Sequence, residues 1–307
     1  MKHQPLVSVY LPTRNRVQLL RRSIQSVLDQ DYPRFELLVV DDASTDETAR
    51  ALESMASADS RLRCFQNAAP MGGGAARNVA IREARGEFVT GIDDDDLMLP
   101  GRLTSLLSGH RDSDAFVCSG FYILHEQAGW YEVRSSTYEE ITLAQLLARN
   151  VVGNQALMRT DRVRDVGAYD ETLPAWQDYD LWTRMVLRYG PARRISDPTY
   201  IFFESSDPLK ITNSEAAIIG AQQYLERYSN LMSANQLQAH QLMQAAVQRR
   251  RLTLHEVREC WGPETRRRVA GYWVRSNLPG SEGLLHAWRR WRRPITELPA
   301  AIRGQPN

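Results

Sequence analysis

The sequence contains few cysteines and no long apolar run. Three of its 307 residues are Cys. Cys64, Cys118 and Cys260 lie far apart without CxxC spacing, so neither a disulfide framework nor a zinc site is expected. No stretch approaches the roughly 18 apolar residues of a membrane-spanning helix, and the N-terminal segment MKHQPLVSVYLPTRN lacks the apolar part of a signal peptide. We therefore expect a chain of the reducing cytoplasm that is neither secreted by that route nor embedded in a membrane.

Lysine is almost absent, and the positive charge is unevenly distributed. Among the 38 basic residues only Lys2 and Lys210 are lysines, and the whole chain carries a net charge of +1. From position 249 onward 13 Arg stand against 5 Glu, a net charge of +8, so residues 1–248 carry −7. This tail also contains the stretch HAWRRWRRP. Interleaved Trp and Arg are typical of a segment lying on an anionic membrane surface; alternatively, the rings pack onto the main domain and the arginines are solvated. Nucleic acid is bound by similar chemistry, but we expect no nucleic-acid partner.

Up to about residue 200, short apolar strands alternate with amphipathic helices. Strands are predicted over 6–12, 35–42, 61–67 and 86–92, and helices over 16–30, 44–56 and 75–84. The second helix is expected to open at a Ser44/Thr45 cap, with Glu47 three residues after Ser44. Short connections between alternating strands and helices indicate a mostly parallel, Rossmann-like α/β sheet flanked by helices. In such sheets ligands bind beyond the carboxyl ends of the strands.

Three polar motifs fall at those carboxyl ends. PTRN follows the first strand, DDAS follows the second, and DDDD follows the strand that begins near Glu87. The last motif, residues 93–96, places four carboxylates in a row. Because ionised carboxylates repel one another, such a run needs basic side chains or an oxygen-preferring divalent cation nearby, unless it is a solvated turn.

Two common ligand-binding motifs are excluded by missing residues. The first strand-to-helix turn, LPTRNR, has no glycine, so the dinucleotide-binding fingerprint of a Rossmann domain is absent. MGGGAARN lies later and does not match it; residues 72–74 are expected to form a flexible entry to the following helix. An EF-hand calcium loop is also excluded, because Leu97 and Met98 occupy the positions where that motif needs an oxygen ligand and a glycine.

Taken together, four stretches resemble the family 2 glycosyltransferases, which have the GT-A fold. These stretches are VSVYLPTRN, SVLDQDYPRFELLVVDDASTDET, GAARNVAIREARGEFVTGIDDDDLMLPGRL and WQDYDLWTRMVLRYG. The resemblance covers residues 6 to about 200 in the family's order and spacing, and it implies a GT-A catalytic domain over residues 1–215. Beyond it, apolar residues at three and four spacing predict a helical, Arg/Trp-rich region over residues 216–307.

The resemblance implies a metal site at the acidic run. The family's DXD element aligns with Asp93, Asp94 and Asp95 and holds a cation on the donor's diphosphate, whose charge grows as the glycosidic bond breaks. Asp95 is the best candidate ligand, with Asp93 beside it, and Asp93 and Asp94 are expected at the nucleotide sugar. Mg²⁺ or Mn²⁺ is expected because carboxylate oxygens suit hard ions and two substrate phosphates complete the octahedron. Asp96 is expected to cap the following helix.

The nucleotide end of the donor is assigned to the earlier motifs. By the resemblance, Asp42 accepts a hydrogen bond from N3–H of uracil or thymine, and Pro12 and Thr13 line the base pocket. Arg77 is expected to reach the base or the phosphates. The family commonly has an aromatic residue where this chain has Arg14, and a guanidinium plane can also stack on a base or pair with phosphate. A surface arginine is the alternative for Arg14.

The stretch AWQDYDLWTRM matches the family's Glu-Asp element, with Gln177 in place of Glu. This leaves Asp178 as the general base for the acceptor hydroxyl, whose own pKa is far too high for attack at neutral pH. Asp180 is expected to face elsewhere and to cap a helix. Gln177 and Trp176 are expected at the acceptor, where the Trp ring offers a flat apolar face to a sugar; a core tryptophan is the alternative.

The segment TYIFFESSDPLKITNS lacks the histidine that many family members carry there. Glu204 or Asp207 is therefore a candidate to complete the metal coordination. Lys210 is a candidate for binding the departing diphosphate, because a compact ammonium suits a phosphate; a solvated loop lysine is the alternative.

The resemblance implies an inverting glycosyltransferase that uses a UDP- or dTDP-sugar. Its expected acceptor is a glycan or lipid-linked glycan of a bacterial surface polysaccharide or lipopolysaccharide, and its expected location is peripheral, on the cytoplasmic face of the membrane. A non-catalytic sugar-nucleotide-binding or glycan-binding subunit would need the DXD or base carboxylate to be missing, and both are present. A nucleotidyltransferase would need a glycine-rich basic loop near the N-terminus, which PTRNR is not.

Overall fold

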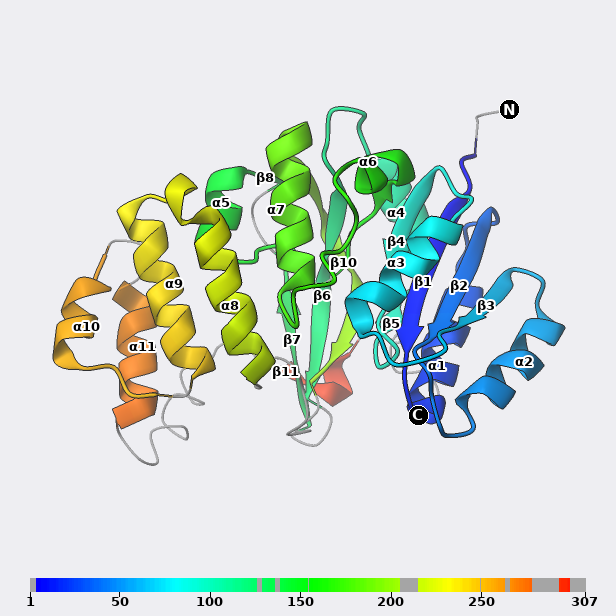
Figure 1. Cartoon of the computed structure of the whole chain (residues 1–307), viewed down its shortest axis with the longest axis horizontal. Helices are drawn as coiled ribbons and strands as arrows, with labels where there is room; N and C mark the ends of the chain where they lie inside the picture. The colour runs from blue at the N-terminus through cyan, green and yellow to red at the C-terminus, as the bar shows by residue number, and fades with distance from the viewer. Residues whose placement is uncertain are drawn as a thin grey trace.

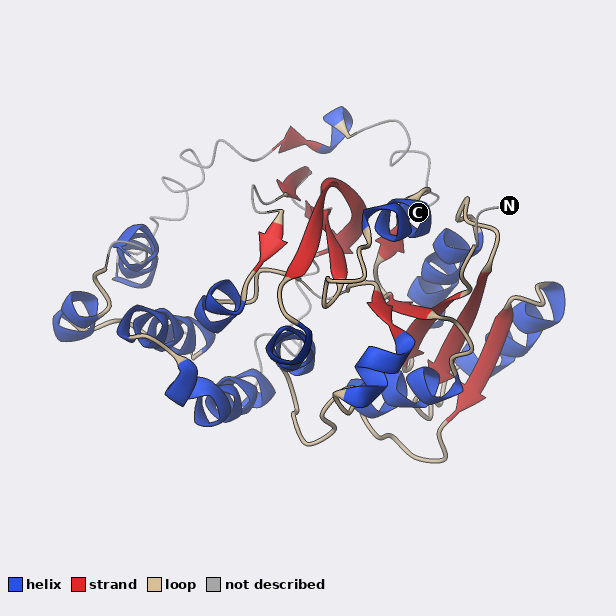
Figure 2. Cartoon of the chain, turned by 90° about the horizontal axis from the view of Figure 1, so that it is seen from above, coloured by secondary structure: helices blue, strands red, loops and turns tan. Residues whose placement is uncertain are grey.

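The chain contains two β-sheets side by side with a group of helices at one end (Figure 1). The structure is a computed structural model that describes residues 4–125, 129–135, 139–153, 155–204, 215–248, 250–262, 266–277 and 293–298. Helices flank the first sheet on both faces (Figure 2). The fold is the mixed α/β arrangement that the alternating pattern predicts.

The first sheet contains the predicted strands and helices, and one short strand, β9, that was not predicted. Its strands are β1 (Val7–Thr13), β2 (Phe35–Asp41), β3 (Leu62–Gln66), β4 (Phe88–Gly91) and β9 (Met158–Arg159), and its helices are α1 (Val17–Leu28), α2 (Thr48–Ala58) and α3 (Gly73–Glu83). The order is β3-β2-β1-β4-β9, parallel except for β9. β2 is buried along its whole length, as expected for a parallel strand covered on both faces. The carboxyl ends of β1, β2 and β4 therefore meet at one edge.

The second sheet is mixed, and the sequence did not predict it. Its strands are β5 (Leu97–Met98), β6 (Val117–His125), β7 (Trp130–Arg134), β8 (Glu140–Ile141), β10 (Ala192–Phe203) and β11 (Arg293–Pro294). The order is β11-β7-β6-β10-β5, with β8 also paired to β10. β6 and β10 are parallel, although the register shifts on both sides of Pro198. The helices associated with this part are α4 (Arg102–Gly109), α5 (Leu143–Ala148) and α7 (Gln177–Tyr189), whereas α6 (Thr160–Asp165) contacts β9 and α3 at the first sheet.

The acidic run crosses from one sheet to the other. β4 ends at Gly91 in the first sheet, whereas β5 pairs Leu97 and Met98 with Ile201 and Tyr200 of β10 in the second. Residues 92–96 therefore bridge the two sheets at the carboxyl ends of the parallel strands. This connection places all four carboxylates at the junction between the sheets.

The C-terminal helices pack against α5 and the segment that leads into α7. They are α8 (Glu215–Tyr228), the short helix η3 (Ser229–Leu231), α9 (Ala234–Val247), α10 (Leu254–Glu259) and α11 (Arg266–Asn277), followed by η4 (Ile295–Glu297). A Cβ on Gly220 of α8 would lie 2.6 Å from the carbonyl oxygen of Ala175, so only glycine permits this approach to α7. Tyr224 and Tyr228 join the main core, whereas α9 to α11 enclose a small core of their own. The division at residue 215 stays a prediction. Among the described residues, no helix is long and apolar enough to cross a bilayer.

Asp180 joins α7 to α8 through buried ion pairs. The side chain is 1% exposed. Its Oδ2 accepts a hydrogen bond from Arg184 Nε at 2.7 Å, and its Oδ1 accepts from Arg227 Nη1 at 2.6 Å and from the Tyr228 hydroxyl at 2.8 Å. The prediction that Asp180 caps a helix is wrong, because its carboxylate points across to α8. The N-cap of α7 is Trp176, without a side-chain cap bond.

The predicted Ser44/Thr45 cap is also wrong. α2 begins at Thr48, and its N-cap residue Glu47 makes no side-chain cap bond. Ser44 Oγ instead accepts from the backbone N–H of Asn15 at 2.9 Å, and the backbone N–H of Thr45 donates to Asn15 Oδ1 at 2.7 Å. These residues hold the loop after β2 against the loop after β1, so the helix starts one turn later.

We expect Asp180→Asn to lower the free energy of unfolding by about 3 kcal/mol or more, because the amide keeps the shape of the side chain but leaves two arginines without their buried carboxylate. Urea unfolding followed by circular dichroism measures this. Asp165→Asn is the matched control: Asp165 also pairs with an arginine and a tyrosine, but its side chain is 46% exposed, so solvent screens the pair and the loss should be much smaller. Equal losses in the two variants would contradict the role of Asp180.

Candidate active site

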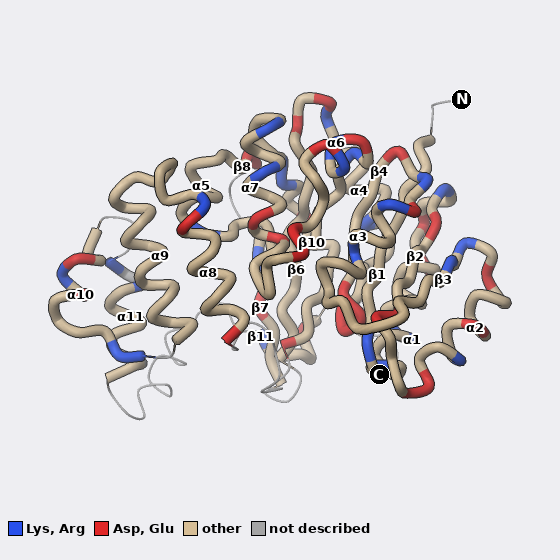
Figure 3. Tube along the Cα trace, viewed as in Figure 1, with Lys and Arg blue, Asp and Glu red and all other residues tan. Residues whose placement is uncertain are grey.

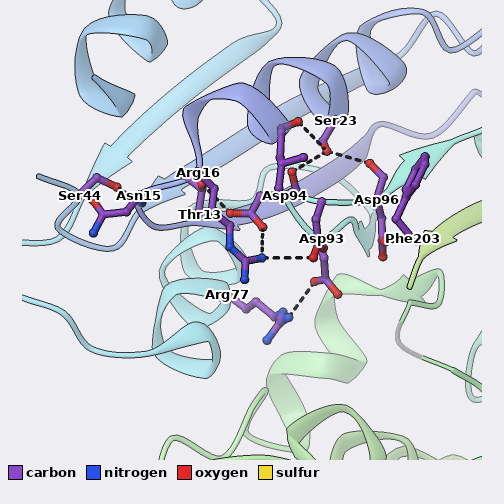
Figure 4. A network of polar contacts seen from close by, with 12 residues as sticks. Thr13, Asn15, Arg16, Ser23, Ser44, Arg77, Asp93, Asp94, Asp96 and Phe203 are labelled. Carbon is purple, nitrogen blue, oxygen red and sulfur yellow. Dashed lines mark hydrogen bonds and ion pairs between the residues drawn. The ribbon is translucent and has the colours of Figure 1, made fainter. Parts of the chain in front are cut away.

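The acidic turn is fixed against α1 by its backbone. The Ser23 hydroxyl lies 2.9 Å from the carbonyl oxygen of Asp94 and 2.8 Å from that of Asp96. Ser23 is completely buried, because the turn covers this part of α1. The side chains of Asp93, Asp94 and Asp96 point in different directions from this turn (Figure 4).

Asp96 is buried under the turn and does not cap a helix. Its Oδ2 accepts from the Tyr200 hydroxyl at 2.8 Å, and its Oδ1 accepts from the backbone N–H of Phe203 at 3.2 Å. Burial, together with the charges of Asp95 and Asp93, raises the pKa of Asp96 well above its ordinary value. The predicted cap is wrong because β5 intervenes, and α4 begins only at Arg102 after Gly101. Asp96 therefore ties the turn to β10.

Asp94 and Asp95 share one arginine that sequence reasoning missed. Arg16 Nη1 donates to Asp94 Oδ1 at 3.1 Å and to Asp95 Oδ2 at 3.2 Å. The other oxygen of Asp94 accepts from Thr13 Oγ1 at 2.8 Å. Burial raises the pKa of Asp94 to about 6, although Arg16 and Thr13 oppose the shift. The available signal was the second arginine of PTRNR, which stands at the start of an amphipathic helix and at the same sheet edge as DDDD.

Asp93 faces the opposite side of the turn, toward α3. Its Oδ1 accepts from Arg77 Nη2 at 2.8 Å and from Gln155 Nε2 at 3.1 Å. Arg77 Nη1 also donates to Gln177 Oε1 at 3.4 Å, at the start of α7. Arg77 thus joins the expected donor side to the expected acceptor side. Gln155 is buried just before β9, and no sequence motif indicated that it would contact Asp93.

Asp178 lies on the first turn of α7, and one of its oxygens lacks a partner. Oδ1 is buried without a hydrogen bond in the described part of the chain. Burial raises the pKa of Asp178 to about 6; Asp93 adds to the shift, and Arg77 and the Tyr169 hydroxyl oppose it. A carboxylate with a raised pKa and a free acceptor oxygen has the properties of a general base.

The two residues before Asp178 have local packing partners. The Trp176 ring is half-buried and lies 5.4 Å from the Tyr179 ring and 5.8 Å from the Tyr224 ring, centroid to centroid. Gln177 Nε2 donates to the carbonyl oxygen of Leu173 at 2.7 Å. Roles for Trp176 and Gln177 at an acceptor stay predictions.

Asp42 is held at the far end of the same sheet edge. It accepts hydrogen bonds from Asn67 Nδ2 and from the backbone N–H groups of Met71 and Gly72, each at 2.8 Å. Partial burial raises the pKa of Asp42, but these hydrogen bonds outweigh it, and the pKa lies below its ordinary value. The positive charge of exposed Arg14 acts in the same direction. Asp42 is therefore a fixed anion.

Three of the other residues predicted at the donor lie within the described part of the chain, and two lie outside it. Pro12 is half-buried at the end of β1, and the Thr13 hydroxyl faces Asp94. Glu204 Oε2 lies 2.9 Å from His125 Nδ1 on β6, an ion pair when the imidazole is protonated. Asp207 and Lys210 lie outside the described residues.

The donor set at the turn suits a hard divalent cation that the substrate completes. The described residues contain no group of three or more His, Cys, Asp or Glu placed to hold a metal ion. Two carboxylate oxygens, from Asp94 and Asp95, nevertheless converge on the cationic Nη1 of Arg16. Mg²⁺ and Mn²⁺ prefer such oxygens and take their remaining ligands from water and substrate phosphates. The residues present therefore fit a metal bound together with a diphosphate.

Comparison with known proteins places this geometry in one family. Residues 8–166 match Glycosyl transferase family 2. A putative colanic acid biosynthesis glycosyl transferase, WcaA, of Escherichia coli (strain K12) is 35% identical over 224 residues, covering 72% of this chain and 80% of that protein. A GalNAc(5)-diNAcBac-PP-undecaprenol beta-1,3-glucosyltransferase of Campylobacter jejuni is 37% identical over 114 residues, covering 37% of each chain.

Solved structures with the same fold include TarS of S. aureus and a mannosyltransferase of Pyrobaculum calidifontis. TarS 1–349 in complex with UDP-GlcNAc is 19% identical, with a TM-score of 0.54, and the match covers 92% of both chains. The mannosyltransferase, in complex with GDP-Man and Mn²⁺, is 18% identical, with a TM-score of 0.57, and the match covers 94% of this chain and 80% of that one. These likenesses show the GT-A fold. The family match and the relative from Escherichia coli show that the chain belongs to glycosyl transferase family 2 and is a glycosyltransferase.

Proposed function

We propose that this glycosyltransferase moves a sugar from a UDP- or dTDP-sugar to a glycan or lipid-linked glycan, with inversion, during synthesis of a bacterial surface polysaccharide or lipopolysaccharide. One observation carries the proposal: Arg77 contacts both Asp93 of the acidic turn and Gln177, the neighbour of Asp178. The Arg77 side chain thus links Asp93, expected at the sugar donor, to the start of α7, which carries the candidate base Asp178. The named relatives support the polysaccharide class, and the UDP-GlcNAc complex of TarS supports the donor class.

In this proposal the strand ends bind the donor in sequence order. Asp42, already a fixed anion, accepts the N3–H of the base, with Pro12 and Arg14 beside it. Asp95 holds Mg²⁺ or Mn²⁺, and Asp94 rather than Asp93 lies beside it, because Asp93 faces Arg77 on α3. The cation would supply positive charge to the diphosphate as it leaves. Lys210 contributes further positive charge to the same group.

Asp178 acts on the acceptor. Its unpartnered Oδ1 accepts the proton of the acceptor hydroxyl while that oxygen bonds to the anomeric carbon and the bond to the diphosphate breaks. With a pKa of about 6 the carboxylate is mostly ionised at pH 7, yet it remains basic enough to take a proton. Arg77 balances its charge and orients the start of α7.

The basic tail supports a peripheral membrane location. Figure 3 shows Arg positions on α10 and α11, and Trp261 between these helices is 53% exposed. Trp273, in contrast, packs against the small core of the C-terminal helices. Trp288 and Trp291 lie outside the described residues. Both alternatives for the tail therefore have an example among its described tryptophans: Trp261 is exposed and Trp273 is packed.

A panel of nucleotide sugars tests the function. We expect nucleoside diphosphate release from a UDP- or dTDP-sugar, abolished by EDTA and restored by Mn²⁺ or Mg²⁺, because the diphosphate cannot leave without charge compensation. Asp95→Ala should abolish release, whereas Asp161→Ala, which removes an exposed carboxylate on α6, should not. Full activity in chelator would overturn the metal assignment, and no release from any donor would overturn the transfer function.

The base assignment has its own prediction. Asp178→Asn keeps the side-chain shape but cannot take a proton, so kcat should fall by roughly 10² to 10⁴ while donor affinity changes little. For the wild type, kcat/KM should decline as pH falls through about 6, because the base becomes protonated there. Steady-state kinetics between pH 5 and 8 and nucleotide titration measure both effects. Equal loss of nucleotide binding would instead assign Asp178 to the donor site.

Vesicle co-sedimentation tests the membrane proposal. The protein should bind vesicles rich in anionic lipid at low salt and release at high salt, since each basic residue near the surface contributes about 1 kcal/mol. Trp261→Ala should weaken this binding, and Leu187→Ala, which removes an exposed apolar side chain on α7, should not. Indifference to both lipid charge and ionic strength would leave only a packing role for the tail.

A further inference from the structure

Arg16 occupies the space between two carboxylates of the donor site. It is the N-cap residue of α1, in the turn that follows β1. A single nitrogen, Nη1, lies 3.1 Å from Asp94 Oδ1 and 3.2 Å from Asp95 Oδ2. Figure 4 shows both Arg16 and Arg77 beside the acidic turn, Arg16 at Asp94 and Arg77 at Asp93. The guanidinium therefore stands where a cation shared by these two carboxylates would stand.

The three side chains differ in how firmly they are held. The Asp94 side chain is 9% exposed, and its second oxygen is fixed by the Thr13 hydroxyl. The Asp95 side chain is 24% exposed and that of Arg16 is 39% exposed. The carboxylates are thus prearranged in the fold, whereas a long arginine with its head partly in solvent can change partner at little cost.

We propose that Arg16 is an exchangeable counter-ion of the donor site. In the free enzyme it neutralises Asp94 and Asp95; when a divalent cation and a nucleotide diphosphate bind together, its guanidinium moves from the carboxylates to the diphosphate. This inference rests on the proposed function, in which Asp95 holds the cation on the donor.

Electrostatics requires the exchange if Asp95 binds a metal. A divalent cation on Asp95 Oδ2 would sit about 2.1 Å from that oxygen, close to a guanidinium that contacts the same atom. The two positive groups repel one another, so one of them must leave. A diphosphate offers the guanidinium two parallel charge-assisted hydrogen bonds, the geometry that arginine recognises best. After the exchange Arg16 supports the group whose negative charge grows during transfer.

The exchange makes the cation and the nucleotide depend on each other. A cation that arrives alone must displace Arg16 from both carboxylates while no diphosphate is present to receive it. With the diphosphate present, the cation gains phosphate ligands and Arg16 gains a new partner. Each ligand should therefore raise the affinity for the other by the same factor.

Arg16→Gln tests the proposal because it removes the charge but keeps much of the side chain's length. Mn²⁺ binding without nucleotide is followed by the electron paramagnetic resonance signal of free Mn²⁺, and binding of UDP and dTDP at fixed Mn²⁺ is followed by calorimetry. We expect Mn²⁺ alone to bind several-fold more tightly to the variant, and the nucleoside diphosphate to bind about tenfold more weakly or worse, the loss of a charge-assisted contact. Arg21→Gln, at an exposed position on α1, should match the wild type in both.

The opposite changes in Mn²⁺ affinity and nucleotide affinity distinguish an exchangeable counter-ion from an arginine that only holds the carboxylates in place. Weaker or unchanged Mn²⁺ binding in Arg16→Gln would overturn the proposal, since a brace holds the carboxylates in place without competing for them. If the variant does not fold by circular dichroism, Arg16→Lys replaces it: the charge is kept but the planar fork is lost, so Mn²⁺ affinity should stay near that of the wild type and nucleotide affinity should fall. Unchanged nucleotide affinity in Arg16→Lys would count against the inference. A wild type that binds UDP and dTDP only in the absence of Mn²⁺, or not at all, would instead show that the proposed function fails.

Discussion

The site is arranged so that positive and polar groups offset the negative charge of four adjacent carboxylates at the junction of the two sheets. Two unit charges about 4 Å apart near a protein surface repel by about 4 kcal/mol, so an uncompensated run could not fold into this turn. The partners come from separate elements: Arg16 from the turn after β1, Arg77 from α3, and the Tyr200 hydroxyl and the Phe203 N–H from β10. Each partner fixes one element relative to the turn. The negative charge that would let the turn bind a metal and a diphosphate thus also fixes the positions of the surrounding elements.

Arg77 extends the same compensation to the candidate base. Its guanidinium contacts Asp93 and Gln177 and acts on the charge of Asp178. Behind this contact, Asp180 ties α7 to α8, and Gly220 lets α8 approach the segment just before α7. The start of α7 is therefore held from the donor side by one arginine and from the C-terminal side by an ion pair and close packing. A base that must stay aligned with a donor benefits from both supports.

The parts of the fold that sequence could predict are those with strong local patterns. β1, β2 and β4 are continuous apolar runs that alternate with amphipathic helices, and the resemblance supplied the positions of Asp42, Asp93 and Asp178. The second sheet was not predictable, because β10 contains Pro198 and a polar stretch and several of its partners are two residues long. The cap assignments of Asp96 and Asp180 failed for a common reason. An Asp at the start of a predicted helix commonly caps it, but here each of the two is buried against a distant element that local sequence does not reveal. Arg16 and Gln155 were missed because their importance comes only from the carboxylates that the fold brings to them.

The central claim is that the acidic turn binds a cation together with the donor's diphosphate, and that the Arg16 guanidinium then moves from Asp94 and Asp95 to the diphosphate. The most direct measurement is anomalous diffraction from crystals of the protein grown with UDP and Mn²⁺. The account predicts an anomalous peak about 2.1 Å from a carboxylate oxygen of Asp95, the uracil beside Asp42, and the Arg16 guanidinium on the diphosphate. A peak remote from Asp95, or a diphosphate bound while Arg16 still bridges Asp94 and Asp95, would contradict it.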